Sequence, residues 1–292
     1  MKKAFIQLHI AVLLAGFTGV LGRLISLNEG LLVWYRLMIS AATLWAIVLL
    51  RKKSRYISFK NLWKIFGVGA IASLHWVTFY GSIKYANVSI ALVCFSSIGF
   101  FTALVEPVLF KVRLNKRELL LGILAVAGIC FIFHFDPSYK TGIIIGLISA
   151  LLGALFPILN KKLLEKVDAN TITLYELSGG FFFLTLLLPF YLQLFPAPHV
   201  IPTTIDIFWL LVLAWFCTVL AFSLSVQALK KISAFTVNLS YNLEPLYGII
   251  LAFIIYREDR TLNSGFYIGF FMIMISVVLQ SRMVYLSLQK TK

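Results

Sequence analysis

Long apolar stretches dominate this chain and decide the solvent in which it can fold. Of the 292 residues, 61% are hydrophobic and 13% are charged, and the mean hydropathy is +0.95. Soluble domains carry about 25% charged residues, which help to cover the core against water. The polar residues here are too few for that, so most of the surrounding solvent must be lipid. This composition excludes a disordered chain, a disulfide-rich secreted scaffold, a cytosolic enzyme and a DNA-binding domain.

About ten apolar stretches are long enough to cross a bilayer. A helix needs about 20 mainly apolar residues to span about 30 Å of hydrocarbon. The stretches are 4–22, 30–50, 62–83, 88–110, 118–135, 141–160, 171–193, 206–228, 233–256 and 264–285. The short connections leave no room for a soluble domain. We therefore expect an all-α membrane protein with ten transmembrane helices.

The first apolar stretch follows Lys2 and Lys3, as in a secretory signal. The apolar run continues to Leu21, contains Gln7 and His9, and has no small-x-small cleavage site. We therefore expect it to be the first membrane span.

The basic residues predict the orientation in the membrane. With the N-terminus inside, 19 of the 26 Lys and Arg residues fall in inside segments and 5 in outside loops. Cytoplasmic loops are enriched in Lys and Arg, so both termini are expected to be cytoplasmic, in a plasma or inner membrane. Contact with the inner leaflet also accounts for the net charge of +15, and a nucleic-acid partner is not expected.

The chain divides near residue 138 into two halves of five spans each. Sliding one half on the other by 146 residues aligns 83–88 with 229–234, and in both places a basic turn separates two spans. Because five is odd, the second half would cross the membrane upside down relative to the first. Inverted repeats of this kind recur in secondary transporters, with the binding site at mid-membrane between them.

The turn Ile83-Lys84-Tyr85-Ala86-Asn87 and the segment 228–236, which leads to Leu243-Glu244-Pro245, resemble the EamA family of the drug/metabolite transporter superfamily. The resemblance covers essentially the whole chain. It implies two EamA-like five-helix repeats, 1–138 and 139–292. It also implies a carrier that moves small metabolites, often amino acids outward, by alternating access. The family often has proline where this chain has Gly99, so we expect the proline break of the fourth span at Pro107.

Four charged residues lie within the apolar stretches, where an ion is costly and a functional role is the default expectation. They are Arg36, Glu106, Glu176 and Glu244. Glu244 is the deepest and cannot reach either surface. Glu106 and Glu176 lie nearer the cytoplasmic ends and have pairing at the interface as an alternative, and Arg36 has a structural ion pair as its alternative.

Helical spacing places Asn238, Tyr241 and Glu244 on one face of the ninth span, with Asn242 at its edge. Pro245 has no N–H, so the carbonyl of Tyr241 can turn toward a ligand.

Ser96, Thr102 and Glu106 form a similar stripe in the fourth span. We expect the two stripes to face each other across a central cavity. Close packing of small residues is the alternative explanation.

The third span adds His75, Trp76 and Tyr80 as candidates for the substrate path. The alternative role for His75, as for His9, is a hydrogen bond between helices. The alternative role for Trp76 and Tyr80 is aromatic packing.

The chain shows no motif for hydrolysis, metal binding or nucleotide binding. Its cysteines, Cys94, Cys130 and Cys217, lie in apolar runs without metal-ligand spacing. We therefore expect no enzyme activity, no catalytic residue, no metal and no cofactor. The expected function is secondary transport, by an exporter, of small amino-acid-like metabolites. An integral-membrane enzyme and a channel are the alternatives. The expected partners are the substrate and the lipid bilayer, with protons as a candidate coupling ion and a homodimer as a further candidate.

Overall fold

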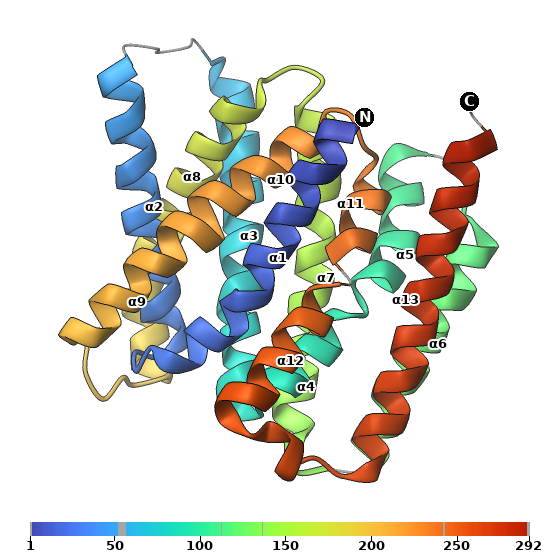
Figure 1. Ribbon diagram of the computed structural model, residues 1–292. Coiled ribbons are helices and arrows are strands. Elements are labelled where there is room, and N and C mark those ends of the chain that lie inside the picture. Colours follow the sequence, from blue (N-terminus) through green and yellow to red (C-terminus); the bar gives the residue numbers. More distant parts are fainter. Residues whose placement is uncertain (1, 52–56, 112, 136, 242, 291–292) are drawn as a thin grey trace.

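Helices account for every regular element in the part of the chain that the computed structural model describes, namely residues 2–51, 57–111, 113–135, 137–241 and 243–290. Figure 1 shows them packed side by side, with both termini at the same end of the bundle. The main helices are α1 (Lys2–Leu24), α2 (Glu29–Arg51), α3 (Phe59–Tyr85), α4 (Val88–Phe95), α5 (Ile98–Phe110), α6 (Lys116–Phe135), α7 (Lys140–Leu163), α8 (Ala169–Leu194), α9 (Thr204–Ala214), α10 (Ala221–Leu229), α11 (Ala234–Tyr241), α12 (Glu244–Tyr256) and α13 (Ser264–Lys290). Three short elements complete them: η1 (Pro137–Tyr139), η2 (Trp215–Leu220) and η3 (Glu258–Arg260).

Side-chain caps mark where several helices begin. Asn87 accepts a hydrogen bond from the amide of Ile90 at 2.8 Å, at the start of α4. Thr203 and Asp206 form a capping box at the start of α9. These side chains satisfy amides that have no partner in the first helical turn, which matters most where hydrocarbon excludes water.

Each of the ten apolar stretches falls on one helix or on two or three helical elements in series. Among the described residues, seven helices are long and apolar enough to cross a membrane, and two further apolar helices, Glu244–Tyr256 and Ser264–Leu279, are shorter. The all-α membrane fold is therefore confirmed, and the count of ten spans stays a prediction.

The fourth apolar stretch breaks at Ser96 and Ser97, between α4 and α5. The expected break at Pro107 is wrong, because α5 continues through that residue. At the observed break the two serine hydroxyls donate back to the carbonyls of Leu92 (3.2 Å) and Cys94 (2.7 Å). Such bonds from serine to its own helix bend it, so the serine pair provides a local cause for the break.

The ninth stretch breaks in the corresponding place, between α11 and α12. In both stretches a helix of 8 residues precedes a helix of 13 residues. Both longer helices end at a basic residue with left-handed backbone, Lys111 (φ 54°) and Arg257 (φ 56°). These two residues are 146 positions apart, which is the offset of the sequence repeat.

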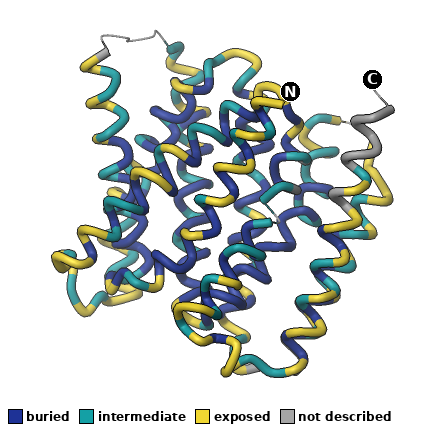
Figure 2. Tube along the Cα trace, in the orientation of Figure 1, coloured by how far each residue is buried: buried dark blue, intermediate teal, exposed yellow. Residues whose placement is uncertain are grey.

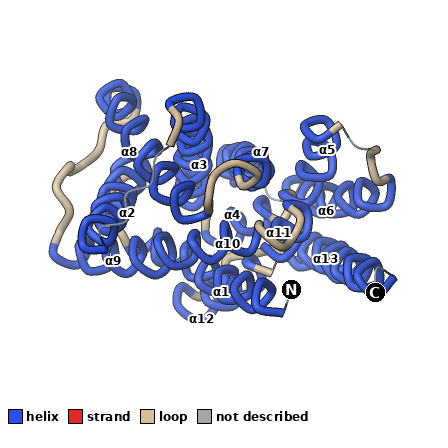
Figure 3. Tube along the Cα trace, turned by 90° about the horizontal axis from the view of Figure 1, so that it is seen from above, coloured by secondary structure: helices blue, strands red, loops and turns tan. Residues whose placement is uncertain are grey.

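The contacts between the two halves show a matching pattern. α3 packs on α7 and α8, while α10 and α9 of the second half pack on α1 and α2. Figure 3, viewed along the bundle, shows α6 and α13 together at one side and α2, α8 and α9 at the other. The α6–α13 contact depends on glycine, because a Cβ on Gly128 would lie 2.6 Å from the carbonyl oxygen of Gly269.

Burial is greatest in the middle of the bundle, and exposed segments lie mainly at its edges and ends (Figure 2). Large apolar side chains such as Leu50, Phe190 and Ile254 are exposed on the outside. An exterior of this kind suits contact with lipid.

Candidate functional site

A small cavity lies among the central helices and has a volume of about 60 Å³. Aromatic side chains form much of its wall, including Trp76 and Phe79 of α3 and Phe222 of α10. Its polar and charged lining residues are Thr18, Arg36, His75, Asn160, Ser225, Asn238, Tyr241 and Glu244. This mixture of an apolar wall and a few convergent polar groups is typical of a small-molecule site.

Arg36 of α2 is the cation of the cavity, and it is 1% exposed. Its Nε donates to the Thr218 hydroxyl at 2.6 Å, Nη1 to the Tyr80 hydroxyl at 2.8 Å, and Nη2 to the Cys217 carbonyl at 3.2 Å. The guanidinium also lies over the Trp76 ring, 4.4 Å from its centroid. A guanidinium has more N–H donors than these three contacts use. Arg36 is therefore held in place and still has donors for an anionic group.

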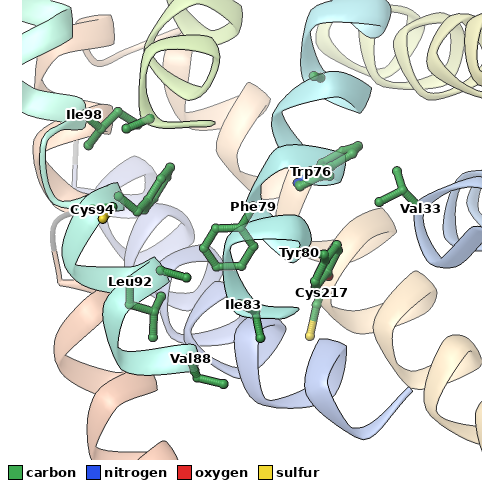
Figure 4. Packing of buried hydrophobic residues seen from close by; sticks show 14 of the residues in the cluster. Val33, Trp76, Phe79, Tyr80, Ile83, Val88, Leu92, Cys94, Ile98 and Cys217 are labelled. Atoms are coloured by element: carbon green, nitrogen blue, oxygen red, sulfur yellow. The ribbon is translucent and has the colours of Figure 1, made fainter. Parts of the chain in front are cut away.

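The π-helical element η2 contains two of these acceptors. The Thr218 hydroxyl donates at 2.9 Å to the carbonyl of Leu213, five residues earlier. Figure 4 shows Trp76 and Tyr80 of α3 on the side toward Cys217. Short π segments are rare and frequently occur at functional sites. The sequence analysis missed Thr218 and Cys217 as partners of Arg36, because no residue pattern marked this widened turn.

Glu244 is the first residue of α12 and lies at the break of the ninth stretch. It is 5% exposed and lines the cavity. α11 ends at Tyr241 and α12 begins just before Pro245. Within the described residues its carboxylate has no hydrogen-bond donor and no ion pair within 4.0 Å. Arg36 is its electrostatic partner across the cavity.

His75 both lines the cavity and joins α3 to α7. Its Nδ1 lies 2.9 Å from the Ser149 carbonyl oxygen and 3.0 Å from the Ser149 hydroxyl. The ring packs against Phe95 and Phe156, at centroid distances of 5.4 and 5.7 Å. This geometry agrees with the alternative of a bond between helices. Tyr80 is fully buried and acts on the cavity through its hydrogen bond to Arg36.

Asn238 and Tyr241 of α11 line the cavity. The Asn238 amide donates to the Thr102 hydroxyl of α5 at 2.8 Å, so Thr102 contacts a lining residue without belonging to the described lining itself. Ser96 and Glu106 also lie outside that lining: the Ser96 hydroxyl bonds back within its helix and Glu106 is half-buried. Asn242 lies outside the described residues.

The sequence analysis also missed Thr18, Asn160, Phe156 and Ser225, which line the cavity. Asn160 carried a signal, since it is a polar residue at the end of an apolar stretch. The others resemble ordinary packing residues, and only the fold brings them to one place.

Together these features define a class: a polytopic helical membrane protein with a buried, charged central cavity. The model of the EamA-like transporter family matches residues 2–134 and again residues 140–282. The chain therefore belongs to the EamA-like transporter family and has the two-repeat architecture of that family.

Curated relatives carry names of the same class. The uncharacterized transporter YetK of Bacillus subtilis is 28% identical over 189 residues, which cover 61% of this chain and 56% of YetK. An uncharacterized transporter of Archaeoglobus fulgidus is 28% identical over 183 residues, covering 61% of this chain and 62% of that protein. One of Haemophilus influenzae is 25% identical over 162 residues, covering 52% and 53%. The matched regions thus span little more than half of each relative.

A crystal structure of another protein shares the fold. Its TM-score is 0.67 at 16% sequence identity, and the match covers 97% of this chain and 98% of the other. This similarity extends over the whole bundle and concerns the fold alone.

Proposed function

We propose that this protein is a secondary transporter that exports small amino-acid-like metabolites by alternating access. The observation that carries the proposal is the presence of Arg36 and Glu244 on one small cavity without an ion pair between them. An amino acid has both a carboxylate and an ammonium group. Its carboxylate would accept hydrogen bonds from the remaining N–H groups of Arg36, and its ammonium would donate a hydrogen bond to the Glu244 carboxylate. Buried charges require such partners.

The aromatic wall of the cavity can contact the side chain of the substrate. Trp76, Phe79 and Phe222 present apolar surface to the cavity, and an apolar or aromatic side chain would gain from its burial. A volume of about 60 Å³ holds only a few water molecules, so the bound state requires the helices to move apart. The present conformation is therefore interpreted as closed.

Two features support two inverted halves, 1–138 and 139–292. The helix breaks match, and the third span of each half packs on the first two spans of the other half. Arg36 comes from the first half and Glu244 from the second, so a substrate that binds both would connect the halves. Rocking of one half against the other would then expose the site to each side of the membrane in turn. The distribution of basic residues supports cytoplasmic termini, which lie together at one end of the bundle.

An integral-membrane enzyme and a channel are the competing classes. Membership of a transporter family favours transport over catalysis. The small volume of the cavity, about 60 Å³, favours a carrier over a continuous pore.

Purified protein in liposomes tests the proposed substrate class. Uptake of a mixture of radiolabelled amino acids would be measured in competition with matched amines that lack the carboxylate and acids that lack the amine. We expect the complete amino acids to compete at least tenfold better than either partial analogue. Equal competition by an amine would show that Arg36 does not bind substrate, and absence of any amino-acid flux would contradict the proposal.

A further inference from the structure

Glu176 is a second buried carboxyl group, and the proposed substrate site does not use it. It is the eighth residue of α8 and is 1% exposed. Neither of its oxygens has a hydrogen-bond partner among the described residues, and none of these residues forms an ion pair with it. Most buried polar groups in proteins are satisfied, so this carboxyl calls for a specific explanation.

The other unsatisfied buried side-chain atoms of the described residues belong to Asn160 and Asn238. Asn160 of α7 is the polar neighbour of Glu176. Both asparagines line the cavity. Asn160 therefore lines the cavity and also lies near Glu176, so it is the polar group through which the cavity and this carboxyl can be connected.

Among the described side chains, the helices around α8 supply no cation to Glu176. α8 packs on α2, α3 and α10, and the described part of α10 has no charged residue. The cationic and histidine side chains described on the neighbouring helices have other surroundings. Arg36 is bonded to Thr218, Tyr80 and Cys217, and His75 is bonded to Ser149. On α3, Lys60 and Lys64 are exposed and Lys84 donates to the Leu27 carbonyl, while Lys161 of α7 donates to the carbonyls of Leu229 and Ile232. An ionised carboxylate in such a place would be very costly.

The position of Glu176 in the fold matches that of Arg36. Each is the eighth residue of the second long helix of its half, α2 or α8. Arg36 is surrounded by acceptors and by the Trp76 ring, whereas no described residue donates a hydrogen bond to the Glu176 oxygens. The two halves therefore place a fixed charge and an uncompensated acid in corresponding helices, at the same count from the helix start.

We propose that Glu176, with Asn160 beside it, is a proton-binding site that couples transport to a proton gradient. This inference rests on the proposed transport function. In the closed conformation the carboxyl oxygen holds a proton. When the cavity opens and water reaches Asn160, the O–H bond breaks, the proton passes to water, and the carboxylate is hydrated. Closure toward the opposite side takes a proton from water there.

Infrared spectroscopy of the purified protein in lipid tests this site without a known substrate. The protonated carboxyl C=O band would be followed against pH in sodium-free buffer. We expect a band that Glu176→Gln removes and that Glu244→Gln and Glu106→Gln leave in place. Glu176→Asp should restore it at a shifted frequency. A band unchanged by Glu176→Gln would overturn the proposal, and so would its removal by sodium at constant pH, which would identify a sodium site.

Flux measurements separate this proposal from the substrate proposal. In liposomes carrying the amino-acid mixture, Glu176→Gln should retain flux down a substrate gradient and lose its stimulation by a pH gradient. Glu244→Gln should lose both. A Glu176→Gln protein that is stimulated as strongly as wild type contradicts proton coupling at this residue. If wild type moves no amino acid, the proposed function fails, and the infrared result still decides whether Glu176 binds a proton.

Discussion

The side-chain amide of Asn238 donates a hydrogen bond of 2.8 Å to the hydroxyl of Thr102, and this bond joins the two broken stretches across the bundle. Thr102 donates in turn to the carbonyl of Ile98 at 2.8 Å. Asn238, which lines the cavity, is thus held in place by Thr102, which does not belong to the described lining. The two residues come from different halves of the chain.

Thr102→Val should therefore lower stability and weaken substrate binding. The substitution keeps the shape but leaves the Asn238 amide with only the Ala154 carbonyl, at 3.5 Å. We expect a loss of about 1 kcal/mol and a raised KM, measured by thermal unfolding in detergent and by liposome uptake. Thr78→Val is the matched control, because the Thr78 hydroxyl bonds only within its own helix. Equal effects of the two substitutions would contradict a special role for the bond.

Arg36→Lys should abolish most transport although it keeps the positive charge. An ammonium cannot reproduce the planar set of N–H donors, so the Thr218 hydroxyl and Cys217 carbonyl would lose their shared partner. Each lost bond to a charged group is worth about 1.5–3 kcal/mol, so initial uptake rates should fall at least tenfold. A monodisperse Arg36→Lys protein with normal uptake would show that charge alone suffices.

Glu258 connects distant parts of the chain at one end of the bundle. It forms an ion pair with Arg23. Its carboxylate also accepts hydrogen bonds from the backbone amides of Val88 and Ser89, at 3.1 and 2.9 Å, at the start of α4. Glu258→Gln should loosen this end, because the ion pair is lost and the helix start has a weaker partner. Cys217, on the cavity wall, should then react faster with a water-soluble maleimide.

That labelling would be measured with Cys94→Ser and Cys130→Ser in the background, so that Cys217 alone reports. Asp259→Asn is the matched control, since Asp259 is the exposed neighbour of Glu258. An unchanged labelling rate in Glu258→Gln would mean that this contact does not keep the cavity closed.

The fold class could be predicted from sequence because apolar stretches of membrane length leave few alternatives. Glu244 and Asn238 were also predictable, since a polar residue deep in such a stretch needs a reason to be there. The partners of Arg36 were not, because Thr218 and Cys217 reach it through a π-helical turn without a sequence signature. The break predicted at Pro107 was wrong, because a proline in the last turn of a helix need not break it. The actual break lies at Ser96 and Ser97, whose side-chain hydrogen bonds could not be predicted from composition.

The orientation predicts where reporters should be active. Fusions after Lys60 and after Lys166 should report a cytoplasmic location, and a fusion in the 194–205 loop an external one, because basic residues concentrate on the proposed inner side. A pair of reporters, one active only inside and one only outside, measures this. External activity at both lysine positions would reverse the proposed topology.

Glu244 provides the most direct measurement of the central claim, that a charged cavity between two halves binds the transported molecule. Glu244→Gln keeps the side chain's shape and removes its charge, and Glu106→Gln does the same for a carboxyl off the described cavity wall. Initial amino-acid uptake would be measured in liposomes containing equal amounts of each monodisperse protein. The account predicts that Glu244→Gln abolishes uptake while Glu106→Gln retains it. Uptake by Glu244→Gln at the wild-type rate, with unchanged pH dependence, would contradict it.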